Sequence, residues 1–265
     1  MQLEGNSRKM STQLGDTIQY TLRLGEGTCD LNQFIGQHIE FRFLNEINCI
    51  ICGKVTKKSF AQGYCYPCMI NSPENSECII RPELCRGHLG EGRDPEWEQR
   101  NHVCEHVVYL AASSALKVGV TRGQQVPTRF IDQGASAVKI IARTPHRCAA
   151  GEIEVALKEE FTDRTSWQKM LKNDVIESPD WDEAFDLAER IVPFMHQEYL
   201  VDDEPIIDLN FPVLEYPTKV KSLSFDKLEV VEGKLMGIKG QYLLFDDNRV
   251  LNIRKHNGYR LTFSA

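Results

Sequence analysis

The sequence has no long hydrophobic run and no excess of positive charge, and each absence excludes a class of protein. No apolar stretch approaches the length of about twenty residues that a membrane-spanning helix needs. The first residues also lack the basic-then-apolar order of a secretory leader. We therefore expect a cytoplasmic protein without a membrane partner. A net charge of −7 argues against a general nucleic-acid coat protein.

What the chain has is a sizeable apolar fraction and an uneven distribution of charge. With 265 residues and 42 % hydrophobic content, it can bury a proper core. Residues 103–150 hold six Lys and Arg against two Asp and Glu, and residues 216–265 hold nine against five. Residues 151–215 hold five against eighteen. The centre and the tail are therefore basic, as expected for a protein directed at phosphates.

Two pairs of cysteines have the spacing of a metal site. Cys49 and Cys52 form one C-x-x-C pair, Cys65 and Cys68 form a second, and twelve residues separate the pairs. A reducing cytosol favours metal ligands or free thiols over disulfides. Four such thiolates can surround Zn²⁺, and a closed four-cysteine site is structural. The alternative is four cysteines without a metal, or a redox pair.

A second group of cysteines and histidines follows. Cys85 and His88 form a C-x-x-H pair, with Cys78 before it and Cys104 after it. We expect these four residues to bind a second zinc ion. The alternative is that the cysteines belong to the core and the histidines to the surface. Between these residues, Asp94-Pro95 predicts the first turn of a helix.

The central stretch, residues 107–161, begins with a predicted hairpin. Residues 107–111 and 116–120 are short apolar runs, and Ser113-Ser114 between them is a turn signal. The first strand carries Tyr109, and the second carries Lys117-Val118-Gly119. A helix opened by Pro127-Thr128 then carries Arg129, a third strand covers residues 137–142, and a further helix carries Glu152 and Glu154.

This order of elements resembles the GIY-YIG nuclease superfamily. The resemblance implies a phosphodiester-cleaving site with one divalent metal, Mg²⁺ or Mn²⁺. Tyr109 takes the place of the first tyrosine, Lys117-Val118-Gly119 that of the triplet, and Arg129 that of the arginine. Glu154 takes the place of the metal-binding glutamate, with Glu152 as the fallback. Lys117 stands where the family has its second tyrosine, which leaves the identity of the general base open.

These residue types suit phosphodiester hydrolysis. Arg129 can bind two phosphate oxygens at once, and Glu154 can bind Mg²⁺. Tyr109 or Lys117 would have to polarise the attacking water. In the alternative interpretation, Tyr109 is only a core residue, Arg129 pairs with Asp132 or Glu154, and the module binds nucleic acid without cleaving it.

A second resemblance covers roughly residues 41–171 and includes the cysteine pairs. It is to an uncharacterised bacterial family, domain of unknown function 2797. It is carried by the segments CIICGK, GYCYPC, IIRPELC, GRDPEWEQ, VYLA, LKVGVTR, PTRFIDQGA, AGEIEVALK and TSWQKML. The resemblance implies a GIY-YIG-like module fused to a zinc ribbon and brings no established activity.

The two ends of the chain are predicted to be rich in strands. Residues 17–24 and 38–43 alternate polar and apolar side chains. From residue 208 on, about five short strands predict a small barrel of the OB or SH3 kind. Barrels of this kind often bind nucleic acid. The candidates for contacting it are Lys239, Arg254 and Lys255 of this region, together with Arg122 of the central stretch. Residues 181–196 form an amphipathic helix that Pro193 bends or ends, and its acidic face either is solvated or binds a protein partner.

We therefore expect an α+β protein made of five parts. These are a β segment (1–48), the zinc ribbon with the second cluster (49–106), a GIY-YIG-like module (107–175), an acidic helical linker (176–210) and a C-terminal β-barrel (211–265). The expected function is that of a metal-dependent endonuclease acting on DNA or RNA. The alternatives are a non-catalytic, zinc-containing module that binds nucleic acid or protein, and a purely structural protein.

Overall fold

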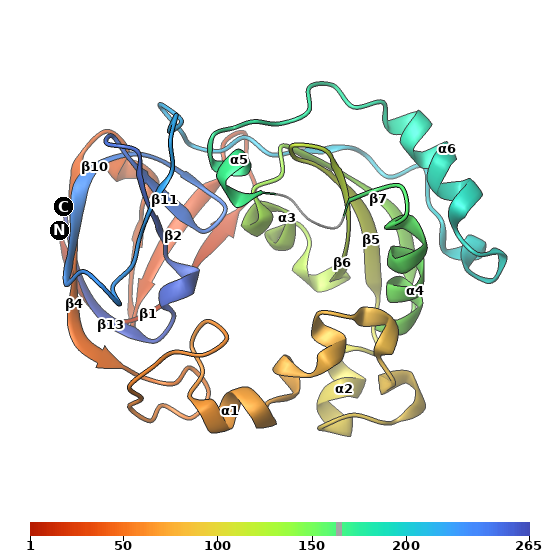
Figure 1. The fold of residues 1–265 in the computed structure, drawn as a ribbon, viewed down its shortest axis with the longest axis horizontal. Helices are drawn as coiled ribbons and strands as arrows, with labels where there is room; N and C mark the ends of the chain where they lie inside the picture. Colours follow the sequence, from red (N-terminus) through yellow and green to blue (C-terminus); the bar gives the residue numbers. More distant parts are fainter. Residues whose placement is uncertain (163–165) are drawn as a thin grey trace.

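The chain folds around two β-sheets with several helices, so the predicted α+β class is confirmed (Figure 1). The computed structural model describes residues 1–162 and 166–265. Within this part of the chain, no helix is long and apolar enough to cross a membrane. The strands are β1 (Gln2–Gln13), β2 (Gln19–Leu24), β3 (Gly27–Asp30), β4 (His38–Ile47), β5 (His106–Ala112), β6 (Leu116–Arg122), β7 (Ala137–Thr144), β8 (Ile207–Asp208), β9 (Lys221–Leu223), β10 (Val230–Lys239), β11 (Tyr242–Phe245), β12 (Arg249–Asn252) and β13 (Tyr259–Ser264). The α-helices are α1 (Tyr66–Asn71), α2 (Pro95–Asn101), α3 (Thr128–Gln133), α4 (Arg147–Leu157), α5 (Trp167–Leu171) and α6 (Trp181–Ile191).

The larger sheet contains strands from both ends of the chain. Its nine strands run in the order β3-β2-β1-β13-β4-β10-β11-β12-β9. Strand β13 has β1 on one edge and β4 on the other, both antiparallel. The C-terminal strands therefore do not form a separate barrel, because their last strand pairs with N-terminal strands on both sides. Residues 1–48 and 211–265, which the sequence analysis treated as two units, build one sheet, and the two termini lie side by side (Figure 1).

The smaller sheet has the order β6-β5-β7-β8, and β5 is antiparallel to both of its neighbours. The predicted hairpin of β5 and β6 is confirmed. All seven residues of β5 are buried, because both faces of the strand are covered. Val107, Tyr109 and Ala111 belong to the core shared with the larger sheet. Val108 and Leu110 face the opposite core, which contains α4 and α6.

Helix α6 is part of this second core. Asp180 caps its N-terminus, because the Asp180 carboxylate accepts a hydrogen bond from the Glu183 amide at 2.9 Å, and the helix ends two residues before Pro193. Its apolar face buries Phe185 and Ala188 against the module. The segment predicted as an acidic linker thus covers one face of the smaller sheet, and its strand β8 joins the edge of that sheet.

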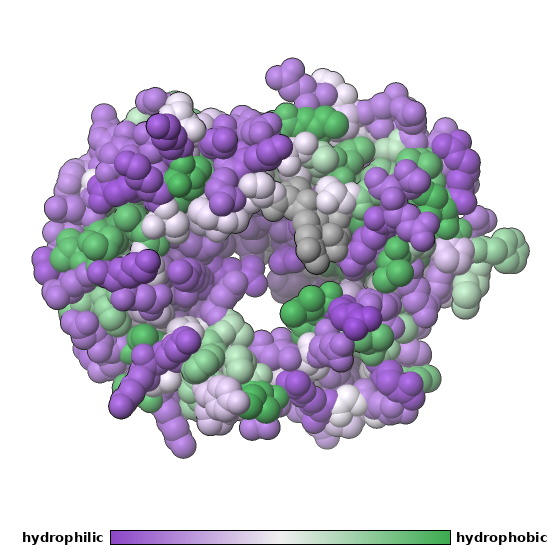
Figure 2. All heavy atoms as spheres, viewed as in Figure 1, coloured by the Kyte–Doolittle hydropathy of each residue, from purple (hydrophilic) through white to green (hydrophobic). Residues whose placement is uncertain are grey.

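The two sheets enclose a hollow. Helices α1 and α2, with the loops around them, connect the large sheet to the small one along one side of the molecule (Figure 1). In the space-filling view, an opening lies between the two halves, with both hydrophilic and hydrophobic residues at its edge (Figure 2). Asp132 of α3 holds the halves together, since its carboxylate accepts hydrogen bonds from Lys9 Nζ of β1 and Gln241 Nε2, both at 2.8 Å.

Candidate functional site

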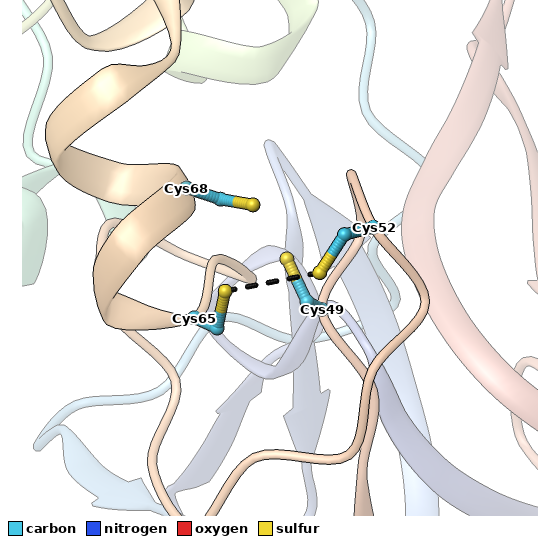
Figure 3. Close-up of side chains that lie close together, drawn as sticks. All are labelled: Cys49, Cys52, Cys65 and Cys68. Atoms are coloured by element: carbon cyan, nitrogen blue, oxygen red, sulfur yellow. Dashed lines mark hydrogen bonds between the residues drawn. The ribbon is translucent and has the colours of Figure 1, made fainter.

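The four cysteines of the two C-x-x-C pairs come together between β4 and α1 (Figure 3). Their sulfur atoms all lie within 4.8 Å of one another, and Cys52 Sγ is 3.8 Å from Cys65 Sγ. Sulfur atoms at the corners of a tetrahedron, each about 2.3 Å from a central zinc ion, are about 3.8 Å apart. The cluster therefore has the size that a four-cysteine zinc site requires.

The local backbone prepares these cysteines for a metal. Gly53 has a φ of +71°, and its amide donates to the carbonyl of Cys49 at 2.9 Å, which closes a tight turn around the first pair. Burial raises the pKa of the Cys49 thiol, but hydrogen bonds from the backbone of Cys52, Cys65 and Ile51 outweigh it and bring the pKa to about 6. Because a thiolate is the form that binds metal, this cluster could hold a structural zinc ion and fits a zinc ribbon.

The four residues that the sequence places in a catalytic site line one cavity of about 380 Å³. They reach it from four different elements: Tyr109 from β5, Lys117 from β6, Arg129 from α3 and Glu154 from α4. Residues 79–82 form another wall of the cavity. A second cavity of about 320 Å³ shares Arg129 with the first, so the two adjoin.

Gly119 explains how Tyr109 fits into the sheet. A Cβ atom at Gly119 would lie 2.7 Å from both Cζ and Oη of Tyr109. The glycine of the Lys-Val-Gly triplet is therefore required by the tyrosine on the neighbouring strand, since Tyr109 and Gly119 are direct partners in the register. The two residues form one structural unit at the floor of the cavity.

The hydroxyl of Tyr109 belongs to a polar network. With the amide oxygen of Gln133 turned toward it, Tyr109 Oη donates to that oxygen at 2.5 Å, and Arg129 Nε donates to the same atom at 2.8 Å. Burial raises the pKa of Tyr109, although the positive charge of Arg129 opposes this. Tyr109 is therefore a neutral phenol at neutral pH. No ion pair of Arg129 is found within residues 1–162 and 166–265, and Asp132 bonds to Lys9 and Gln241 instead.

Glu154, not Glu152, is the carboxylate of the cavity. Glu154 is buried and forms an ion pair with Lys158 at 3.2 Å. Burial raises its pKa, and Lys158 and Arg147 oppose that effect. Glu152 points away, and its carboxylate bonds to His196 Nε2 at 2.7 Å. Glu154 is the only carboxylate among the described residues that line the cavity.

Arg147, in the first turn of α4, was missed by the sequence analysis. It lines both cavities, and its Nε donates to the carbonyl of Cys78 at 2.8 Å while Nη2 donates to that of Ile79 at 2.9 Å. The sequence contained a signal for this residue, because Arg147 lies at the start of the helix that carries Glu154 and within the basic segment 103–150. Arg147 thus ties the wall of residues 79–82 to the module.

The candidates for contacting nucleic acid have different positions. Arg122 lines the adjoining cavity, Arg254 is half-buried, and Lys255 is exposed. Lys239 is fully buried, and its Nζ donates to Asn173 Oδ1 at 2.7 Å. The prediction for Lys239 is therefore wrong, because strand β10 directs its ammonium group into the interior, away from any nucleic acid.

That buried ammonium group has an aromatic environment. Lys239 Nζ lies 5.3 Å from the ring centre of Phe211 and 5.2 Å from that of Tyr216. Burial lowers its pKa to about 8.

The second Cys/His cluster forms with two unexpected members. Cys78 and Cys85 come together as predicted, but with Glu98 and His102 in place of His88 and Cys104. His88 stacks on His146, with 4.4 Å between ring centres. Cys104 is half-buried, and among the described residues neither it nor His88 belongs to a metal-sized cluster. The available signal was the i,i+4 spacing of Glu98 and His102 on the helix that Asp94-Pro95 predicts.

Comparison with known proteins identifies the family of the chain and no individual relative. No curated protein and no solved structure matches the sequence significantly. One family model, described as a protein of unknown function (DUF2797), matches residues 36–261. The match includes the smaller sheet, the larger sheet from β4 onward without β1 to β3, the cysteine clusters and the cavity, and so covers most of the chain. The chain therefore belongs to the DUF2797 family.

Proposed function

We propose that the cavity binds DNA or RNA and hydrolyses a phosphodiester bond with one divalent cation, Mg²⁺ or Mn²⁺. The observation that carries the proposal is the meeting of Tyr109, Lys117, Arg129 and Glu154 around one cavity. These residues are up to forty-five positions apart, and each has a use in phosphoryl chemistry. Packing alone does not require an arginine, a lysine and a buried carboxylate at one place.

The chain's own residues have distinct tasks in this proposal. The guanidinium groups of Arg129 and Arg147 neutralise the phosphoryl oxygens. The carboxylate of Glu154 would hold the cation, which when bound stabilises the leaving oxygen and activates water. Because the Tyr109 hydroxyl donates a hydrogen bond to the amide oxygen of Gln133, its own oxygen can accept a hydrogen bond from the attacking water. Lys117 faces the same space from β6.

One observation favours a second candidate, a module that binds nucleic acid without cleaving it. Lys158 already neutralises Glu154 at 3.2 Å, and a cation would have to compete with this ammonium group. The arginines of the two adjoining cavities would bind the phosphate backbone in either case.

The deciding experiment compares cleavage and binding in matched variants. Labelled single- and double-stranded DNA and RNA are incubated with Mg²⁺ or Mn²⁺ and with wild type, Arg129→Ala or Glu154→Gln. We expect each substitution to slow cleavage by about 100-fold or more, since Arg129→Ala removes the charge that neutralises the phosphoryl oxygens and Glu154→Gln removes the carboxylate that would hold the cation. Glu152→Gln on the same helix and Arg260→Ala on the distant β13 are controls and should cleave at the wild-type rate.

Each outcome decides between the candidates. Equal cleavage by every preparation would reveal a contaminating nuclease and end the proposal. Binding by fluorescence anisotropy without cleavage in wild type, lost in Arg129→Ala, would establish the second candidate. Loss of cleavage in Glu152→Gln and not in Glu154→Gln would transfer the metal-binding role to Glu152.

A further inference from the structure

The second cluster has the dimensions of a metal site. The ligand atoms of Cys78, Cys85, Glu98 and His102 all lie within 4.8 Å of one another. His102 Nδ1 is 3.5 Å from Cys85 Sγ and 3.8 Å from Cys78 Sγ. Sulfur and nitrogen ligands of one tetrahedral zinc ion are about 3.6 Å apart, given metal–ligand bonds of about 2.3 and 2.0–2.1 Å.

The cluster contains a polar group that the protein does not satisfy. The Glu98 side chain is 3 % exposed and that of His102 is 2 % exposed. Glu98 Oε2 lies against His102 Nδ1, yet it is a buried oxygen without a hydrogen bond of proper geometry. Burying a carboxylate oxygen without a hydrogen bond is costly, and a bound cation would remove that cost.

The loop after Cys85 closes tightly over Glu98. A Cβ atom at Gly92 would lie 2.8 Å from Glu98 Cδ. Only a residue without a side chain can approach the carboxylate this closely. A cavity of about 300 Å³ reaches Cys78 and Glu98 from outside and offers a route for an ion.

We infer that Cys78, Cys85, Glu98 and His102 bind a second zinc ion, which fixes residues 79–82 as a wall of the candidate active site. Two thiolates and an imidazole favour zinc over Mg²⁺ or Ca²⁺. Cys78 directly precedes that wall and Cys85 follows it, whereas Glu98 and His102 lie on or next to α2. One ion would therefore fasten both ends of the wall to one helix. The inference does not depend on hydrolase activity.

The test counts metal ions in matched variants. Native mass spectrometry and elemental analysis of wild type should find two zinc ions per chain. We expect one ion in Cys85→Ser and in His102→Gln, and two in His88→Ala and Cys104→Ser. The last two variants are controls, because they remove the pair of ligands that sequence spacing alone suggests. One ion in wild type, or a loss in either control, would overturn the assignment.

A second measurement needs no substitution, in case the variants fail to fold. The metal-free protein is titrated with Co²⁺ while thiolate-to-cobalt absorption is followed. Both equivalents should produce this absorption, one about half as strong as the other, since two thiolates replace four. Absorption that stops after one equivalent would exclude thiolates from any second site.

The role of the wall has its own test. Amide hydrogen exchange in residues 79–84 should accelerate in Cys85→Ser, while exchange around Cys49 stays as in wild type. Unchanged exchange in residues 79–84 would show that no ion fastens the wall.

Discussion

Gly119 lacks a side chain at the point where the Tyr109 ring crosses strand β6. This explains why the Lys-Val-Gly triplet ends in glycine, because a side chain at this position would collide with the Tyr109 ring. The lysine of the triplet faces the cavity two residues earlier. Together, Tyr109 and the triplet place a phenol hydroxyl and an ammonium group on adjacent strands at the same cavity.

We predict that Gly119→Ala destabilises the protein. The added methyl group would lie 2.7 Å from Tyr109 Cζ, and the fully buried ring cannot move away without disturbing its neighbours. Overpacking of this kind costs about 1–3 kcal/mol, measured as the free energy of unfolding in urea. Gly15→Ala is the control, since its Cβ would meet only Thr17 O at 3.4 Å, and it should change stability by less than about 0.5 kcal/mol. Equal stability of both variants would contradict the packing described for Tyr109.

At the scale of residues, sequence order indicated the side chains that lie on successive elements of one motif. Tyr109, Lys117, Arg129 and Glu154 follow one another in the order that resembles the GIY-YIG nucleases, and that resemblance implied that they meet at one site. Glu98 could not be found in this way. Its partner Cys78 lies in a short 3-10 turn and Cys85 directly follows another, and such turns have no hydrophobic period to read.

Helix α4 carries Glu154, and its contact with the preceding wall depends on Gly151. A Cβ atom at this position would overlap the backbone of Pro82 and Glu83, and it would lie 2.8 Å from Glu83 Cα. The helix therefore packs directly against the segment between Cys78 and Cys85. This contact places the carboxylate and the wall on the same cavity.

Gly151→Ala tests this contact through the sign of the change in the free energy of unfolding. In an unhindered helix, alanine is more favourable than glycine by about 1 kcal/mol. Here we expect the opposite, a loss of about 1–3 kcal/mol, because backbone atoms cannot yield as a flexible side chain can. Chemical denaturation measures the difference. A variant more stable than wild type would mean that α4 and residues 82–83 do not touch.

At the scale of elements, the hydrophobic pattern of the sequence predicted the strands whose side chains are buried. It did not predict a strand whose side chains are mostly polar. Strand β5 has a continuous apolar run after His106, and residues 116–120 of β6 and 137–142 of β7 are mostly apolar apart from a lysine in each. Strand β1 has twelve residues, of which only Ser7 and Met10 are buried. No alternation of apolar side chains marks it, because hydrogen bonds to β2 and β13 hold it on both edges.

The whole molecule depends on pairings that no local signal reveals. Gln2 pairs with Ser264, and Tyr259 pairs with Ile47. A strand predicted from its own residues does not disclose a partner two hundred positions away, so the two ends were assigned to separate units. The core also joins both sheets, since Tyr109 and Phe130 of the central module belong to the same cluster as Phe41 and Phe263 of the large sheet.

This shared core predicts that the central module is not independently stable. In residues 107–210 expressed alone, one face of the small sheet and of α3 would expose Tyr109, Phe130, Val138 and Ile140, all of which are at most 2 % exposed in the full chain. A contiguous apolar surface of this kind promotes aggregation. We expect the fragment to lack the near-ultraviolet circular dichroism and the sharp urea transition of the full chain. A monomeric fragment with a cooperative transition would instead show that the module is a domain of its own, because the face now covered by the large sheet could then be left in water.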